Sequence, residues 1–435
     1  MAAPPLRTLH LIALALAAAT PAAARDLVIH AGTLIDGVSP TPRRQVSILI
    51  HDDRITAVQP GFVRPAGAEV IDLSGQTVLP GFIECHDHIS SSGDRRPMNR
   101  FTQSEGDAVI AATRNARREI ELGFTTVRDM GSGPLTGPAL ARAIDSGQIV
   151  GPRLWSAMQA LGPTGGHSDR ANGLRPDIAF AGRDESIVDG PVDARIKVRE
   201  HRRNGASVIK IMPSGGVASI GDDPNHMTMS DDEMVAVVET AHELGLKVAA
   251  HAHGKKAIDH AIVAGVDSIE HGTYSDAETY RLMKQHGTFL VPTLLVADAI
   301  YQTAVNTPEL LPPTVADKAK AVTPTMLGNA RNAYRAGVKI AFGTDQGATS
   351  NRNKAEEFAL LVKAGLPPME AIFTATRNAA ELIGNPQDIG SVQAGRFADI
   401  VAVDGDPLSD ISVLQKMQFV MKGGDIMKQG GTMIR

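Results

Sequence analysis

The sequence predicts an α/β protein: a (β/α)8 barrel, or TIM barrel, with a small β-sandwich built from both ends of the chain. Residues 80–385 alternate eight short apolar segments with helix-like stretches, the count and size of such a barrel. Residues 25–79 and 386–435 instead show short strands of period two, with Gly and Asp at the turns. A doubly wound open sheet is the competing architecture, but no glycine-rich phosphate loop follows the first barrel strand, which favours the barrel.

The composition is that of an ordinary globular enzyme. The 435 residues are enough for one large domain with an accessory one, and 43% hydrophobic with 21% charged residues argues against disorder. The net charge of -5 gives no reason to expect nucleic acid or an anionic membrane as a partner. The single cysteine, Cys85, cannot form a disulfide within the chain.

The first 24 residues read as a secretory signal peptide. Arg7 supplies a positive charge, residues 9–19 form an apolar run, and three alanines at 22–24 precede a cleavage point before Arg25. The apolar run falls short of the roughly 20 residues that a membrane span requires. We therefore expect residues 1–24 to be removed and the mature protein to be periplasmic or secreted.

The elements follow in order along the chain. The β-sandwich strands are expected at 27–30, 46–50, 55–58, 69–72, 390–403 and 419–423. The barrel strands are expected at 77–85, 125–128, 153–156, 208–212, 247–250, 268–270, 289–292 and 339–343, with helices that include 107–122, 231–244 and 255–264. Ser230 and Glu233 have the spacing of a capping box for the helix at 231–244. Residues 298–323, rich in Pro and Thr, are expected to form a loop over the barrel mouth.

Polar residues stand at the carboxyl ends of the expected barrel strands, where the chemistry of this fold is found. The two histidines after the first strand are one residue apart, so both imidazoles can lie on one face of that strand. Such a pair alone is more often a surface feature than a metal site. A buried lysine within the strand at 208–212 is costly unless it is neutralised or paired. The full set converging on the mouth is His86, His88, Lys210, His251, His253, His271 and Asp345.

These residues and the motifs LPGFIECHDH, SIEHGT and GTDQG resemble the amidohydrolase superfamily, in the subtype with two divalent metals. The resemblance implies that His86, His88 and Asp345 bind one metal. It also implies that Lys210, converted to N6-carboxylysine by carbon dioxide, bridges both metals, and that His251 and His271 bind the other. The nitrogen and oxygen donors suit zinc, with manganese or cobalt as substitutes.

The expected mechanism follows from metal chemistry. Two metals lower the pKa of a bridging water, so that a hydroxide attacks the carbonyl near neutral pH. Asp345 is expected to take the proton of this hydroxide and pass it to the leaving amine, although a Gly-Thr-Asp turn can also be purely structural. Spacing alone does not separate His251 from His253 as the ligand. His253 is therefore a candidate for binding the substrate or its oxyanion.

Three further residues are candidate substrate contacts. His167 lies in the glycine-rich loop 162–167, where backbone can approach a ligand, although an exposed loop histidine is the simpler interpretation. Ser214 and His226 follow the strand of Lys210 and are weaker candidates.

The motifs KIMPSGGVAS and VAAHAHG, with GGH at 165–167, look like the branch of metallo-dipeptidases and carboxypeptidases of the Xaa-Pro and Xaa-Arg/Lys type, which includes ochratoxinase-like enzymes. This resemblance implies hydrolysis of N-acyl amino acids or C-terminal peptide bonds, small substrates with a free carboxylate, and assembly into a homo-oligomer. Imidazolonepropionase-like ring opening is the nearest rival, followed by lactonase or phosphotriesterase activity. A binding protein on a decayed barrel would lack some ligands, and none is missing.

Overall fold

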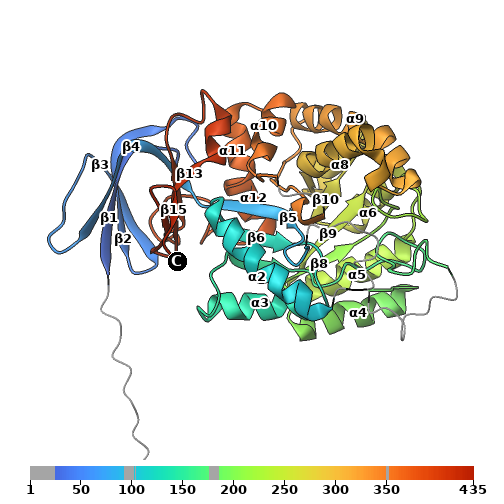
Figure 1. Cartoon of the computed structure of the whole chain (residues 1–435). Helices are drawn as coiled ribbons and strands as arrows, with labels where there is room; N and C mark the ends of the chain where they lie inside the picture. The colour runs from blue at the N-terminus through green and yellow to red at the C-terminus, as the bar shows by residue number, and fades with distance from the viewer. Residues whose placement is uncertain (1–24, 93–101, 103, 176–185, 349–351) are drawn as a thin grey trace, which may run out of the picture.

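The computed structural model describes residues 25–92, 102, 104–175, 186–348 and 352–435. The predicted signal peptide, residues 1–24, lies outside these described residues. A β-sandwich stands beside a barrel of parallel strands surrounded by helices, and both ends of the described chain meet in the sandwich (Figure 1). The predicted fold class is thus confirmed.

The sandwich is one curved sheet whose two halves enclose a single core. Its strand order is β15-β14-β13-β12-β4-β1-β2-β3. The halves join where β4 pairs in parallel with β1 and antiparallel with β12. Alternate residues of both halves, such as Ile29, Ile48 and Phe419, are buried in one apolar cluster. The bounds are β1 Asp26–Leu34, β2 Arg43–His51, β3 Arg54–Pro60, β4 Glu69–Pro80, β12 Ile400–Val403, β13 Met417–Lys422, β14 Asp425–Gln429 and β15 Thr432–Met433.

The expected strand at 77–85 is two strands in two different sheets, so its prediction as one barrel strand was wrong. Leu79, in β4, pairs with Val401 of the sandwich, whereas the first barrel strand, β5, begins at Phe82. Gly81 separates them, and its amide donates to Asp399 O at 2.8 Å. A Cβ at Gly81 would lie 2.2 Å from Thr125 Oγ1, so only glycine lets the chain pass from sandwich to barrel here.

The barrel contains two parallel sheets, β5-β6-β7 and β11-β10-β9-β8. Bridges between Leu161 and Ile211 and between Leu290 and Ile340 join neighbouring parts of the barrel. The expected eighth strand forms only that bridge at Ile340, and its backbone also accepts a hydrogen bond from Cys85 N at Phe342 O. The bounds are β5 Phe82–Asp87, β6 Phe124–Asp129, β7 Arg153–Ser156, β8 Val208–Ile211, β9 Lys247–Ala252, β10 Ser268–His271 and β11 Phe289–Val291.

Helices cover the outside of the barrel, and α5 begins where the capping residues predicted it, with Glu233 accepting a hydrogen bond from the Ser230 amide at 2.8 Å. Residues 298–323 are mostly helical, so their prediction as a loop was wrong. None of the helices in the described part of the chain has both the length and the apolar character needed to cross a membrane. The helices are α2 Glu105–Glu121, α3 Thr136–Asp145, α4 Pro191–Asn204, α5 Asp231–Glu243, α6 Lys255–Ala264, α7 Ala277–His286, α8 Leu294–Asn306, α9 Pro313–Arg335, α10 Glu356–Lys363, α11 Pro368–Thr374 and α12 Arg377–Ile383, with 3-10 turns at Pro308–Leu310, Gln346–Ala348 and Ile411–Gln415.

Candidate metal centre

The structure brings the predicted strand-end residues together in two adjoining groups. In each group the ligand atoms lie within 4.8 Å of one another, and the groups are His86, His88 and Asp345, and His251, His253 and His271. The rings of His86 and His271 connect the groups, with centroids 5.2 Å apart. Lys210 Nζ lies 3.5 Å from His86 Nε2. Two metal-sized donor sets with a lysine beside them are what a binuclear centre needs.

The first group surrounds a carboxylate oxygen that lacks a hydrogen bond. Asp345 Oδ1 is buried without a hydrogen-bond partner, 3.2 Å from His88 Nε2 and 3.8 Å from His86 Nε2. A buried acceptor in that position is costly unless a cation or donor meets it. The backbone of Asp345 is also held at φ +53°, a strained conformation typical of functional sites. These residues therefore fit a divalent cation.

Outer contacts fix the imidazoles of the first group. His86 Nδ1 donates to Glu270 Oε2 at 2.6 Å, and Arg128 Nη2 donates to the other oxygen of Glu270 at 2.9 Å. His88 Nδ1 donates to Gly131 O at 3.0 Å. Both Nε2 atoms are thereby left to face a metal, the usual arrangement of ligating histidines. Burial lowers the pKa of His86 to about 4, which keeps it neutral as a ligand must be.

His88 and Asp345, the other two residues of the first group, are both charged at neutral pH. Burial alone would lower the pKa of His88, but its ion pair with Asp345 outweighs this effect and raises the pKa to about 8. Burial likewise opposes ionisation of Asp345, yet the surrounding histidines hold its pKa below the usual value. Asp345 is therefore a carboxylate at neutral pH.

The second group consists of three buried histidines. Nδ1 of His253 contacts Thr273 Oγ1 at 2.7 Å, and Nδ1 of His271 contacts Thr293 Oγ1 at 2.6 Å. His251 instead donates from Nε2 to Gly215 O at 3.3 Å, which leaves its Nδ1 available. Burial lowers the pKa of all three histidines, so they are neutral. The geometry gathers both His251 and His253, and the choice between them as ligand stays a prediction.

Lys210 is buried in β8, with 1% of its surface exposed. Burial is the main cause that lowers the pKa of its amine, to about 8. A substantial neutral fraction near neutral pH is what reaction with carbon dioxide requires. Carboxylation would also replace an unfavourable buried cation with an anion suited to two metals.

The candidate substrate residues have different surroundings. His167 stacks on His251 with ring centroids 4.4 Å apart. Ser214 is buried. Its hydroxyl donates to Gly215 O and accepts from the His253 amide, so it hydrogen-bonds with the backbone around the site. The His226 side chain is exposed, and its carbonyl accepts from the Gly215 amide. Substrate binding by these three residues stays a prediction.

The sequence patterns did not point to three charged residues that support the site. Glu270 and Arg128 hold His86 as described, and Glu84 Oε1 accepts from the amides of His86 and Thr344 at 2.8 and 3.0 Å. Glu84 therefore joins the first barrel strand to the eighth. The signal was the same one that drew attention to Lys210, namely a charged residue inside an apolar strand.

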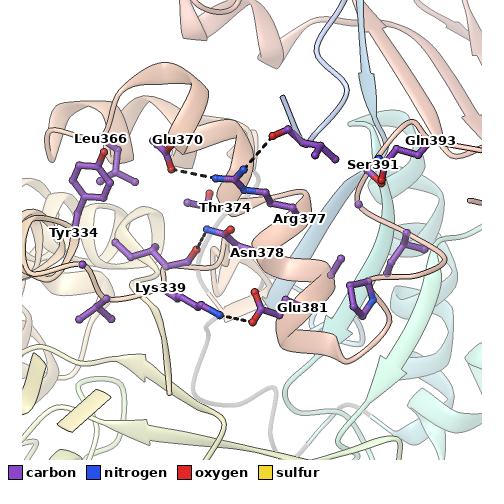
Figure 2. A pocket seen from close by; sticks show the side chains of 18 of the residues that line it. Tyr334, Lys339, Leu366, Glu370, Thr374, Arg377, Asn378, Glu381, Ser391 and Gln393 are labelled. Atoms are coloured by element: carbon purple, nitrogen blue, oxygen red, sulfur yellow. Dashed lines mark hydrogen bonds and ion pairs between the residues drawn. The ribbon is translucent and has the colours of Figure 1, made fainter. Parts of the chain in front are cut away.

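A separate cleft of about 670 Å³ lies near residues 337–340, at the start of the eighth strand segment and away from Asp345 at its end (Figure 2). Figure 2 shows two ion pairs in this cleft, Arg377 with Glu370 and Lys339 with Glu381. Large volume alone does not indicate chemistry, and the charges in these two pairs neutralise each other. The metal centre, with its strained backbone and a buried carboxylate oxygen that lacks a hydrogen bond, is therefore the candidate active site.

Comparison with known proteins gives a consistent result. The sequence profile of the Amidohydrolase family matches residues 77–427. Ochratoxinase from Aspergillus niger is 34% identical over 435 residues, covering 94% of this chain and 88% of that protein. A solved structure of a Xaa-Pro dipeptidase with bound methionine in the active site has a TM-score of 0.89 at 37% identity, covering 93% of this chain and 100% of that one. A prolidase complexed with N-methylphosphonate-L-proline has a TM-score of 0.85 at 32% identity, with coverage of 93% and 100%.

The profile covers the barrel and the C-terminal strands of the sandwich, and the relatives match nearly the whole described chain. The predicted resemblance, including the branch with ochratoxinase and Xaa-Pro dipeptidases, is confirmed. The chain belongs to the amidohydrolase family.

Proposed function

We propose that this protein hydrolyses the amide bond of N-acyl amino acids or the C-terminal peptide bond of short peptides, with two divalent metal ions. The observation that carries the proposal is the pair of adjoining donor groups with Lys210 beside them. The names of its relatives, an ochratoxinase and a Xaa-Pro dipeptidase, support an amide or peptide substrate.

Each donor group has a part in this proposal. His86, His88 and Asp345 would hold one ion, His251 and His271 the other, and carboxylated Lys210 would reach both. Zinc suits this set of nitrogen and oxygen donors. When bound, the ions supply Lewis acidity, which lowers the pKa of water and polarises the carbonyl of the substrate.

Proton transfer falls to the side chains of the chain itself. Asp345 is ionised at neutral pH because the histidines around it lower its pKa. It can therefore accept a proton from the attacking water and return it to the leaving amine nitrogen. His253 and His167 adjoin His251 by ring contacts, with centroids 4.8 and 4.4 Å away, and would bind the substrate beside the cleaved bond.

The decisive experiment combines metal removal with a substrate panel. Purified protein would be dialysed against a chelator, then assayed before and after metal return on N-acyl phenylalanine, Xaa-Pro and Xaa-Arg dipeptides, a lactone and a cyclic amide. We expect metal-dependent hydrolysis of one of the open-chain amides. Activity that survives full metal removal, or hydrolysis of the lactone or cyclic amide alone, would overturn the proposal.

Two variants sharpen this test. His271→Ala removes a donor of the second group and should abolish hydrolysis together with one metal equivalent. His286→Ala, at an exposed residue at the end of α7, should retain the full metal content and activity and serves as the matched control.

A further inference from the structure

Lys318, on helix α9, makes an unusual set of contacts with the segment that follows strand β8. Its ammonium donates to the carbonyl oxygens of Gly216 at 2.7 Å, Ser219 at 2.7 Å and Asp222 at 2.9 Å. It also lies 3.3 Å from Asp222 Oδ1, and its side chain is only 16% exposed. An ammonium has three N–H donors, so these oxygens use its full capacity.

The segment that Lys318 holds, residues 214–222, contacts a histidine of the candidate active site. Ser219 Oγ lies 2.8 Å from His167 Nδ1. A Cβ at Gly216 would lie 2.1 Å from His167 Cε1, so the backbone there is packed directly against the ring. The same ring stacks on His251. His167 therefore contacts both residues 214–222 and a candidate metal ligand.

The carboxylate of Asp222 strengthens this arrangement. Its Oδ1 accepts hydrogen bonds from Ser219 Oγ and from the Gly216 amide, the latter at 3.3 Å. Residues 214–222 contain three glycines, and Ala218 and Ile220 are exposed, so Val217 supplies the main apolar contact that holds this segment against the core. Without a cation at this point, buried carbonyl and carboxylate oxygens would lose their donors, which is costly.

We propose that Lys318 is a positioning residue for the hydrolytic site. By tying α9 to residues 214–222, it keeps His167 stacked on His251, where His167 meets the substrate. The expected effect on kcat/KM rests on the proposed function. The contact between Lys318 and residues 214–222, called the tether below, is a property of the folded chain and does not depend on that function. Residues 298–323 were expected to influence the site as a loop over the barrel mouth. In this proposal they do so instead through Lys318, which lies on a helix.

The kinetic test is a double-mutant cycle. Lys318→Met keeps the apolar stem, and we expect kcat/KM to fall about tenfold with unchanged metal content, mostly through KM, because a hydrogen-bonded charge is lost. In a His167→Ala background, the same substitution should change kcat/KM little, since the residue it positions is gone. Lys320→Met, at an exposed position of α9, is the matched control and should behave as wild type. An undiminished effect of Lys318→Met without His167 would refute the positioning role.

A second arm does not depend on activity. Hydrogen exchange of the Gly215 and Gly216 amides should accelerate about tenfold in Lys318→Met and not in Lys320→Met, because the tether holds these amides closed. Gly216→Ala places a methyl group against the His167 ring, so it should reproduce the rise in KM although Lys318 is intact. Unchanged exchange in Lys318→Met would overturn the tether. A wild-type protein that hydrolyses no amide would instead refute the proposed function, while exchange would still decide the role of Lys318.

Discussion

Replacing Glu270 by glutamine tests whether contacts behind the metal centre hold His86 in place. Glu270 is fully buried and accepts from Arg128 Nη2 at 2.9 Å, His86 Nδ1 at 2.6 Å and Ser268 Oγ at 2.5 Å. Glutamine keeps the size of the side chain but has no charge and only one acceptor oxygen. Arg128 and His86 cannot then both keep their acceptor.

Two separate losses follow. Arg128 is 1% exposed, and removing the partner of a buried charge costs about 3–5 kcal/mol of folding free energy. His86 loses the acceptor that orients its ring, which lowers metal affinity roughly 10–100-fold. Burial opposes ionisation of Glu270, but Arg128, His86 and Lys210 together outweigh it and lower the pKa to about 2 from 4.5. The stabilisation is therefore full above pH 4.5, and it should be lost as pH falls toward 2.

Denaturant unfolding of the metal-free protein and competition with a metal-binding dye measure the two losses separately. The double variant Arg128→Met/Glu270→Gln removes the unpaired cation, so we expect it to regain stability but not metal affinity. Glu278→Gln, at a surface glutamate of α7 paired with Arg281, is the control and should change neither. Wild-type metal affinity in Glu270→Gln would refute the argument that this carboxylate orients His86.

Three further predictions concern Lys210 and Asp345. Lys210→Ala should lose most hydrolysis and one or both metals, and added short carboxylic acids should restore part of each; a full metal complement without rescue would contradict a bridging carboxylate. In the metal-free protein the amine of Lys210 has a pKa of about 8 and loses its proton as pH rises. At fixed dissolved carbon dioxide, the initial rate of carbamate formation, followed by carbon-13 NMR, should therefore rise about tenfold from pH 6 to pH 7 and level off above the pKa, because only the neutral amine reacts; a flat profile would argue against it. Asp345→Asn should retain metal at the second donor group while hydrolysis falls about 10²–10⁴-fold, and normal turnover would remove its role in proton transfer.

The barrel could be predicted because its strands are short, apolar and separated by helices of regular period. Two details were beyond sequence patterns. Residues 77–85 read as one apolar run because β4 and β5 are both buried, although they lie in different sheets. Residues 298–323 looked like a loop because they contain proline, yet Pro308 and Pro313 occupy first-turn positions of helical segments, where proline is tolerated.

The metal-ligand candidates could be predicted because strand direction alone places them at one end of a barrel. The charged residues within the apolar strands could have been noticed, but their pairing could not be predicted, since the partners come from distant strands: Arg128 reaches Glu270 across 142 residues of sequence. Lys318 was equally hidden, because nothing on an amphipathic helix marks one lysine among several as the donor to a remote loop. His251 and His253 both lie in the second donor group, so neither the sequence spacing nor the distances distinguish which of the two is the metal ligand.

The pairing of β4 with β12 has a consequence for how the chain is made. Ile400 pairs with Pro80, so an entire barrel must be synthesised between the two halves of the sandwich. At roughly 5–20 residues per second, β1–β4 would wait about 15–60 s with one edge unpaired and their apolar face uncovered. Such an edge is open to pairing with other nascent chains. The sandwich is therefore the part of the molecule most dependent on chaperones during synthesis, and C-terminal truncation before β12 should yield aggregates and no soluble barrel.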